Sequence, residues 1–138
     1  MSSLYTASAT AVGGRNGTVK SSDGVLNLEV RIPKEMGGPG GAYTNPEQLF
    51  AAGYAACFDS ALAFVARSQK VTLTSTSVNA EVGIGPNKTG GFLLTARLKV
   101  KIEGPDRETA QKLLEAAHQV CPYSNATRGN IEVSLELI

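Results

Sequence analysis

One apolar segment constrains this chain more than any other. Residues 49–66 read LFAAGYAACFDSALAFVA, with no proline to interrupt a helix. Just before it, Asn45 suits a helix cap, Pro46 suits the first turn, and Glu47 favours the positive end of the helix dipole. The sequence therefore predicts one long, buried helix that runs to about Ser68.

The segment has the length of a marginal membrane span, but its composition favours the core of a soluble fold. Asp59 and Ser60 interrupt it, and much of it is Ala and Gly rather than Leu or Ile. The N-terminus shows no basic stretch followed by an apolar one, as a secretory signal would. A net charge of +1 gives no basic excess for binding nucleic acid or an anionic membrane. We expect a cytoplasmic protein with neither a membrane nor a nucleic acid as partner.

Alternating apolar and polar residues predict strands on both sides of the long helix. A second, amphipathic helix is expected after Gly104-Pro105-Asp106, and Pro122 should end it. The Gly- and Pro-rich segment 33–41 breaks regular structure and predicts a loop. The expected strands are residues 4–12, 18–21, 25–32, 76–84, 92–103 and 131–137. The resulting order β-β-β-α-β-β-α-β indicates a single α+β domain, residues 1–138, with mostly antiparallel pairing.

The chain has two cysteines, and each lies at a predicted helix. Cys57 is in the middle of the long helix, and Cys121 follows the second one. Cytoplasmic cysteine pairs tend to be catalytic or redox-sensing. Taken alone, however, Cys57 is more typical of a small buried hydrophobe, and burial raises a thiol's pKa. A reactive Cys57 needs a cation from elsewhere, and partnership with Cys121 needs Cα atoms about 4.4–6.8 Å apart.

The remaining candidates for chemistry are few. His118, the single histidine, precedes Cys121 by three residues and could share a helical face with it. A Cys57/His118 hydrolase or transferase is therefore an alternative, which His118→Gln should inactivate. Spacings typical of zinc, iron–sulfur, phosphate or dinucleotide sites are absent, so neither a metal nor a bound cofactor is expected. Arg15, in a glycine-flanked turn, is by default a solvated side chain.

Three segments together resemble the OsmC/Ohr family of thiol peroxidases. Residues 44–58 read TNPEQLFAAGYAACF, residues 121–126 read CPYSNA, and the turn 13–17 reads GGRNG. The similarity spans essentially the whole chain in length, element order and motif spacing. The form of the second segment is similar to the organic hydroperoxide resistance (Ohr) branch.

This resemblance implies a function and a site. Cys57 would be the peroxidatic cysteine, Cys121 the resolving one, and Arg15 and Glu47 the charge pair that supports the thiolate. The implied substrates are alkyl and fatty-acid hydroperoxides, and the implied reductant is the dihydrolipoyl group of a lipoylated protein. The implied assembly is an intertwined homodimer. The candidates for an apolar surround of the peroxide are Met36, Phe50 and Tyr123.

One feature of the spacing bears on that dimer. Glu47 and Cys57 are ten residues apart, about 15 Å along a straight helix. Either the helix begins after Glu47, or Glu47 reaches the cysteine of a partner subunit. Two alternatives to an Ohr-type peroxidase remain beside the hydrolase: an OsmC-like peroxidase of broader specificity, and a binding protein or redox sensor that switches through the Cys57–Cys121 disulfide.

Overall fold

The structure, a computed structural model, describes residues 1–138 and confirms the α+β class. The chain divides into two compact units, residues 1–49 and 50–138, and each is described by itself. The single domain expected over the whole chain therefore stays a prediction. Each unit contains a three-stranded sheet, and the first turn of helix α1 belongs to the first unit.

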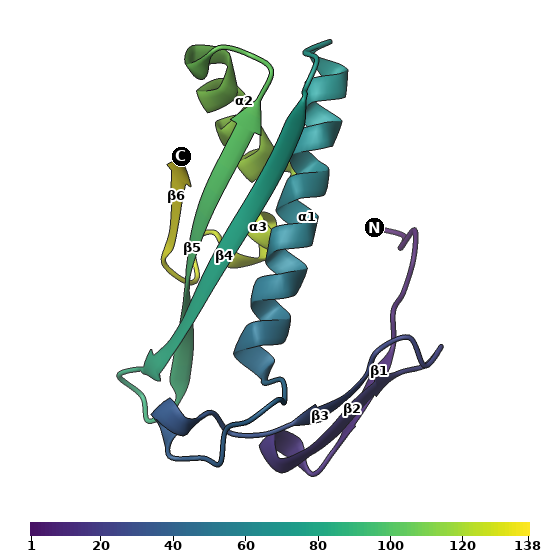
Figure 1. Cartoon of the computed structure of the whole chain (residues 1–138), viewed down its shortest axis with the longest axis vertical. Helices are drawn as coiled ribbons and strands as arrows, with labels where there is room; N and C mark the ends of the chain where they lie inside the picture. Colours follow the sequence, from purple (N-terminus) through teal and green to yellow (C-terminus); the bar gives the residue numbers. More distant parts are fainter. The chain divides into compact units, whose positions relative to one another are not determined.

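The first unit holds an antiparallel sheet in the order β1-β2-β3 (Figure 1). Its strands are β1 (Ala9–Val12), β2 (Gly17–Ser21) and β3 (Asn27–Val30), followed by a 3-10 turn, Lys34–Met36, within the predicted loop. Asp23 and Gly24 lie in the turn of the β2–β3 hairpin, and the strand expected from Val25 begins two residues later. The cause is local: the Asp23 carboxylate accepts hydrogen bonds from the Val25 amide and the Ser21 hydroxyl, which hold Val25 in the turn.

Helix α1 (Pro46–Ser68) begins and ends where the sequence predicts. The Asn45 side chain accepts a hydrogen bond from the Gln48 amide at 2.8 Å, which satisfies one of the free donors of the first turn. At the other end Lys70 takes a left-handed φ of 56°, a conformation usual for glycine, and the Val71 amide bonds back to the Ala66 carbonyl. The side chains carry no signal for this second cap.

The second unit holds a mixed sheet in the order β4-β5-β6, formed by β4 (Ser75–Pro86), β5 (Phe92–Glu103) and β6 (Val133–Leu137). β4 and β5 form an antiparallel hairpin, and β6 pairs with β5 in parallel. On β5, Leu98 and Val100 are fully buried while Arg97 and Lys101 are exposed, so one face of the strand packs on the core and the other faces solvent.

Helix α2 (Arg107–Val120) and the short helix α3 (Pro122–Thr127) connect β5 to β6. Pro122 was expected to end a helix, and α2 does end before it, but Pro122 also begins α3. Its fixed φ and missing N–H suit the first position of a helix. Cys121 is thus the single residue at the corner between the two helices, with extended backbone at φ −63° and ψ 122°.

The core of the second unit lies between the sheet and helices α1 and α2 (Figure 1). The buried residues of α1 form a stripe: Tyr54, Phe58, Ala61, Leu62, Val65 and Ala66. The opposite side is not covered, and Phe64 is 52% exposed. Helix α1 is long and apolar enough to cross a membrane, a property it shares with core helices. The expectation of a wholly buried helix is wrong for the single chain, because the sheet and α2 cover only one side.

Candidate functional site

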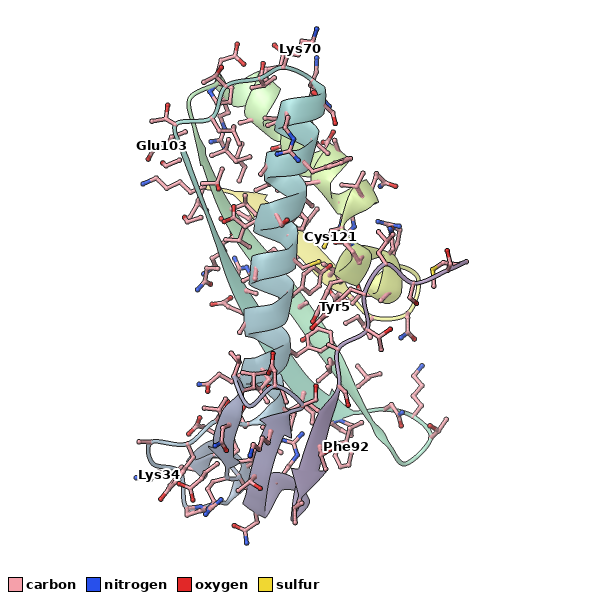
Figure 2. The ribbon with its side chains drawn as sticks, turned by 90° about the vertical axis from the view of Figure 1, so that its right-hand side faces the viewer. Tyr5, Lys34, Lys70, Phe92, Glu103 and Cys121 are labelled. Carbon is pink, nitrogen blue, oxygen red and sulfur yellow. The ribbon has the colours of Figure 1, made fainter.

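The two cysteines meet although they are 64 residues apart in sequence. Cys121 Sγ lies 3.6 Å from Cys57 Sγ, and both thiols are free. Cys121 is fully buried, whereas Cys57 is partly exposed on α1. Figure 2 shows the Cys121 sulfur beside α1. A bonded pair would stand about 2 Å apart, so this is a reduced dithiol within a short movement of a disulfide.

Burial dominates the electrostatics of Cys57. It raises the pKa of the Cys57 thiol, because a thiolate loses water at this position, and the neighbouring Cys121 adds to the increase. The backbone amide of Tyr123 opposes this effect by hydrogen bonding to the Cys57 sulfur, which lowers the pKa. The amide lowers the pKa by less than burial raises it. A further positive charge near the sulfur is therefore needed to form the reactive thiolate.

An aromatic group lies beside the dithiol. Phe50, Tyr54 and Tyr123 pack edge-on or tilted, with ring centroids 5.6–6.2 Å apart. Phe50 also borders an open cavity of about 450 Å³ in the second unit. The cavity's other apolar lining comes mainly from Phe92, Leu93, Leu94 and Ile131. The predicted residues Phe50 and Tyr123 therefore lie together on the side of α1 that carries Cys57.

The predicted charge pair is formed within the first unit. Arg15 Nη1 donates to Glu47 Oε2 at 2.7 Å, and Nη2 donates to Oε1, so the pair is bidentate. The Arg15 and Glu47 side chains are 30% and 12% exposed, which protects the pair from solvent screening more than a surface pair. The bond to Arg15 lowers the pKa of Glu47, and the same bond raises the pKa of Arg15. Arg15 is thus an oriented side chain, not the solvated one expected by default.

A tight turn aims Arg15 at Glu47. Residues Gly14–Asn16 form a 3-10 turn that joins β1 and β2. Gly17 closes it, and a side chain there is impossible because a Cβ would stand 1.8 Å from the Val12 carbonyl oxygen. The glycines around Arg15 therefore have a structural reason, which is the close return of the chain.

Met36 and His118 are the two remaining candidates from the sequence. Met36 is 45% exposed in the first unit, whose placement relative to the dithiol is not described, so its contact with a peroxide stays a prediction. The His118 imidazole hydrogen bonds through Nδ1 to the Ser124 hydroxyl at 2.8 Å. Burial, with a smaller contribution from Arg128, lowers the pKa of His118. The structure shows no hydrogen bond between His118 and Cys57, so it gives the Cys57/His118 alternative no direct support.

The sequence reasoning missed a buried hydroxyl group next to the cysteines. Tyr54 is fully buried and its hydroxyl lies 2.8 Å from Ser124 Oγ and 3.2 Å from Thr127 Oγ1. Ser124 lies within the quoted CPYSNA segment, but a lone Tyr in an apolar helix gives no sign of a polar partner 70 residues away. The only available signal was that a buried tyrosine usually has a partner for its hydroxyl.

Comparisons with known proteins agree with this fold and these motifs. The model of the OsmC-like protein family matches residues 38–136. The organic hydroperoxide resistance protein of Xanthomonas axonopodis pv. citri is 53% identical over 135 residues, 97% of this chain and 94% of that protein. The organic hydroperoxide resistance protein OhrB of Bacillus subtilis is 49% identical over 137 residues, 97% and 98% of the two chains.

Solved structures extend the likeness to three dimensions. The crystal structure of an organic hydroperoxide resistance protein from Elizabethkingia anophelis superimposes with a TM-score of 0.95 at 60% identity. The match covers 99% of this chain and 98% of that one. Sequence, motifs and fold therefore agree that the chain belongs to the OsmC/Ohr family, in its organic hydroperoxide resistance branch.

Proposed function

We propose that this protein is a thiol-dependent peroxidase that reduces organic hydroperoxides to alcohols. A role in peroxide detoxification follows from relatives about 50% identical over nearly the full chain that are named organic hydroperoxide resistance proteins. The observation that supports the chemistry is the pair of free thiols with sulfurs 3.6 Å apart. The partial exposure of Cys57 and the complete burial of Cys121 suit an attacking and a resolving thiol, respectively.

The reaction balances with these two thiols and one external dithiol. The Cys57 thiolate attacks the terminal peroxide oxygen, the O–O bond breaks, and the alkoxide leaves as the alcohol after taking a proton. Cys57 is then a sulfenic acid, which condenses with the Cys121 thiol to form a disulfide and one water. A reduced dithiol restores both thiols by exchange and becomes oxidised itself. We propose the dihydrolipoyl group of a lipoylated protein as that dithiol, with no bound cofactor or metal.

Arg15 is the proposed source of the charge that Cys57 lacks. A guanidinium near the sulfur stabilises the thiolate and offers hydrogen bonds to a peroxide oxygen, while Glu47 holds the guanidinium in one orientation. Because α1 begins at Pro46, Glu47 is already helical, and the possibility that the helix starts after Glu47 is wrong. Ten residues of helix separate Glu47 from Cys57 by about 15 Å along the axis. The Arg15–Glu47 pair of one subunit is therefore proposed to serve the dithiol of another.

The burial pattern supports a homodimer. A sheet is stable when at least one face is covered, yet Val30 is the only buried residue in residues 1–49. Helix α1 likewise leaves one side open, with Phe64 exposed. A second copy of the chain would cover both surfaces and pair each Arg15 with the other subunit's Cys57. The assembly proposed is an intertwined, symmetric homodimer in the cytoplasm.

The surroundings of the dithiol favour organic hydroperoxides over hydrogen peroxide. Phe50 and Tyr123, which pack on the buried Tyr54, and the neighbouring cavity offer apolar surface to an alkyl chain. Each buried methylene favours binding by about 0.8 kcal/mol, so a chain of several carbons gains orders of magnitude in affinity. Hydrogen peroxide has no such group. The proposed preference is therefore for alkyl and fatty-acid hydroperoxides, with Met36 as a further candidate contact.

The test is steady-state consumption of tert-butyl hydroperoxide with excess dihydrolipoamide. The wild type should turn over rapidly, Cys57→Ser should consume no peroxide, and Cys121→Ser should fail or need a different thiol. Substituting hydrogen peroxide for the alkyl hydroperoxide should lower kcat/KM, and equal rates would instead indicate the broader OsmC-like specificity. Slow turnover of the wild type, despite disulfide formation, would refute the peroxidase and favour a redox sensor.

A further inference from the structure

A chain of four hydrogen bonds runs through the region beside the dithiol. His118 Nδ1 contacts Ser124 Oγ, Ser124 Oγ contacts the Tyr54 hydroxyl, and the Tyr54 hydroxyl contacts Thr127 Oγ1. Thr127 Oγ1 in turn contacts the Ser124 carbonyl oxygen at 3.2 Å. Tyr54 and Ser124 are fully buried and Thr127 is 4% exposed. Buried polar groups of this kind rigidify a core when every member is satisfied.

The protons of this chain can be assigned by elimination. The Ser124 carbonyl only accepts, so Thr127 donates to it and must accept from Tyr54. The Tyr54 proton is then used, so Ser124 donates to Tyr54, and His118 donates to Ser124. All four contacts are satisfied only in this direction, with a proton on His118 Nδ1. No buried side-chain nitrogen or oxygen in the structure lacks a hydrogen-bond partner, in agreement with this assignment of the protons.

The hydrogen bond between Tyr54 and Ser124 lies close to the contact between the cysteines. Tyr54 precedes Cys57 by three residues on α1, and Ser124 follows Cys121 by three residues on α3, so each pair shares a helical face. The α1 helix thus contacts this region at three points: Tyr54 to Ser124 by O···O at 2.8 Å, Tyr54 to Thr127 by O···O at 3.2 Å, and the two cysteines by S···S at 3.6 Å. Only the contacts between oxygens are strong bonds in the reduced protein.

This arrangement decides where Cys121 lies. Helix α3 has six residues, and its only buried residues are Ser124 and Thr127, both members of the hydroxyl chain. Besides these hydroxyl contacts, α3 is held against α1 mainly by the packing of the partly exposed Tyr123 ring on Phe50 and Tyr54. The Asn125 amide bonds to the Cys121 carbonyl, so a shift of α3 moves the corner residue with it.

We propose that Tyr54 and Ser124 are positioning residues for the resolving step, and that their hydrogen bond holds Cys121 within reach of Cys57. The proposal rests on the proposed function, since it concerns condensation of a Cys57 sulfenic acid with the Cys121 thiol. In that step the S–O bond breaks, the S–S bond forms and water leaves with the thiol proton. If Cys121 is displaced, the Cys57 sulfenic acid persists for longer and can be trapped or oxidised further.

The first measurement uses the dithiol itself and no peroxide. The dithiol–disulfide equilibrium is determined in glutathione redox buffers for the wild type, Tyr54→Phe and Ser124→Ala, and gives the effective concentration of Cys121 at Cys57. Tyr54→Phe removes only a hydroxyl. Because that hydroxyl bonds to both Ser124 and Thr127, we expect the change to lower the effective concentration by about 5- to 150-fold, the range set by two ordinary buried hydrogen bonds.

The second measurement separates the two chemical steps. One equivalent of tert-butyl hydroperoxide is added, the reaction is quenched at intervals, and dimedone-trapped Cys57 is followed by mass spectrometry. We expect Tyr54→Phe to accumulate the trapped sulfenic acid, with the ratio of condensation rate to oxidation rate reduced by a similar factor.

Thr76→Val is the matched control. It removes the partly buried hydrogen bond from Thr76 to Asp59 of α1, which leads to β4 and not to α3. The control should keep the wild-type effective concentration and the wild-type rate ratio. Its fold and that of Tyr54→Phe are compared by circular dichroism.

The outcomes separate the two proposals. Wild-type effective concentrations in both Tyr54→Phe and Ser124→Ala would overturn the positioning role, and so would an equal decrease in Thr76→Val. If the wild type forms no dimedone adduct and reduces no hydroperoxide, the proposed function fails, while the glutathione equilibrium still decides whether Tyr54 positions Cys121.

Discussion

Adding one methyl group to α1 tests the contact between this helix and Tyr123. Gly53 lies one helical turn before Cys57, and a Cβ built on it would stand 2.5 Å from the Tyr123 hydroxyl oxygen and 3.1 Å from Cζ. Ordinary contact begins near 3.4 Å, so Gly53→Ala requires the hydroxyl to move by about 0.9 Å. The ring can only move by losing contact with Phe50 and Tyr54.

Two opposing effects set the size of the change. Ala is better than Gly inside a helix by about 1 kcal/mol. Against this, each aromatic pair contributes about 0.5–1.5 kcal/mol beyond its buried area, and two pairs are disturbed. We therefore expect Gly53→Ala to be destabilising by about 0–2 kcal/mol. In a Tyr123→Phe background the worst overlap is gone, and the same substitution should be neutral or stabilising by up to about 1 kcal/mol.

Urea unfolding of the wild type, both single variants and the double variant measures this coupling directly. All four are compared at one protomer concentration, because the stability of the proposed dimer would depend on it. We expect a coupling free energy of about 1–2 kcal/mol, in the direction in which Tyr123→Phe rescues Gly53→Ala. Independent sites add to within about 0.3–0.5 kcal/mol, so a coupling inside that range would refute the contact. Gly53→Ala should also slow hydroperoxide reduction, because the Tyr123 amide faces the Cys57 sulfur.

Three further expectations concern the charges. Arg15→Ala should raise the Cys57 pKa and shift the pH–rate profile of peroxide reduction toward higher pH. An unchanged profile would remove Arg15 from the mechanism. Glu47 has a pKa lowered by Arg15, so its pairing stabilises the fold above the usual glutamate pKa and is lost as the pH falls through the lowered value. Glu47→Gln should therefore flatten the pH dependence of stability in the acid range, as measured by urea midpoints; a slope equal to that of the wild type would contradict this. The proton on His118 Nδ1 should appear in imidazole ¹⁵N shifts, and Ser124→Ala should release it to the Nε2–H form; an Nε2–H form in the wild type would contradict the hydrogen-bond direction.

Much of the fold could be predicted because its determinants are local. Asn45 and Pro46 mark the start of α1, and β5 matches the predicted residues 92–103 at both ends. Caps, turns and alternation act between residues at most a few positions apart, so they are visible in the sequence. The errors were local as well: Val25 was assigned to a strand although the Asp23 side chain holds it in the turn.

The candidate site was predictable in a different way. Taken alone, Cys57 was most simply interpreted as a small buried hydrophobe. Only its combination with the 121–126 segment and the 13–17 turn indicated a peroxidase. The bidentate Arg15–Glu47 pair joins residues 32 positions apart, which no helical or strand period relates. Spacing could not single out Arg15 among the arginines, whereas the motif could.

By itself, the sequence determined most of the secondary structure, the α+β class and the family, since short-range propensities and motifs carry that information. Only the tertiary structure decided that the two sulfurs lie 3.6 Å apart, that β6 joins β5 in parallel, and that Tyr54 meets Ser124. These contacts join segments far apart in sequence, and the segments meet only because burial of the apolar stripe of α1 packs the helices onto the sheet. Cys57 is a small hydrophobe in the sequence and one half of a dithiol in the fold, because packing brings Cys121 to it.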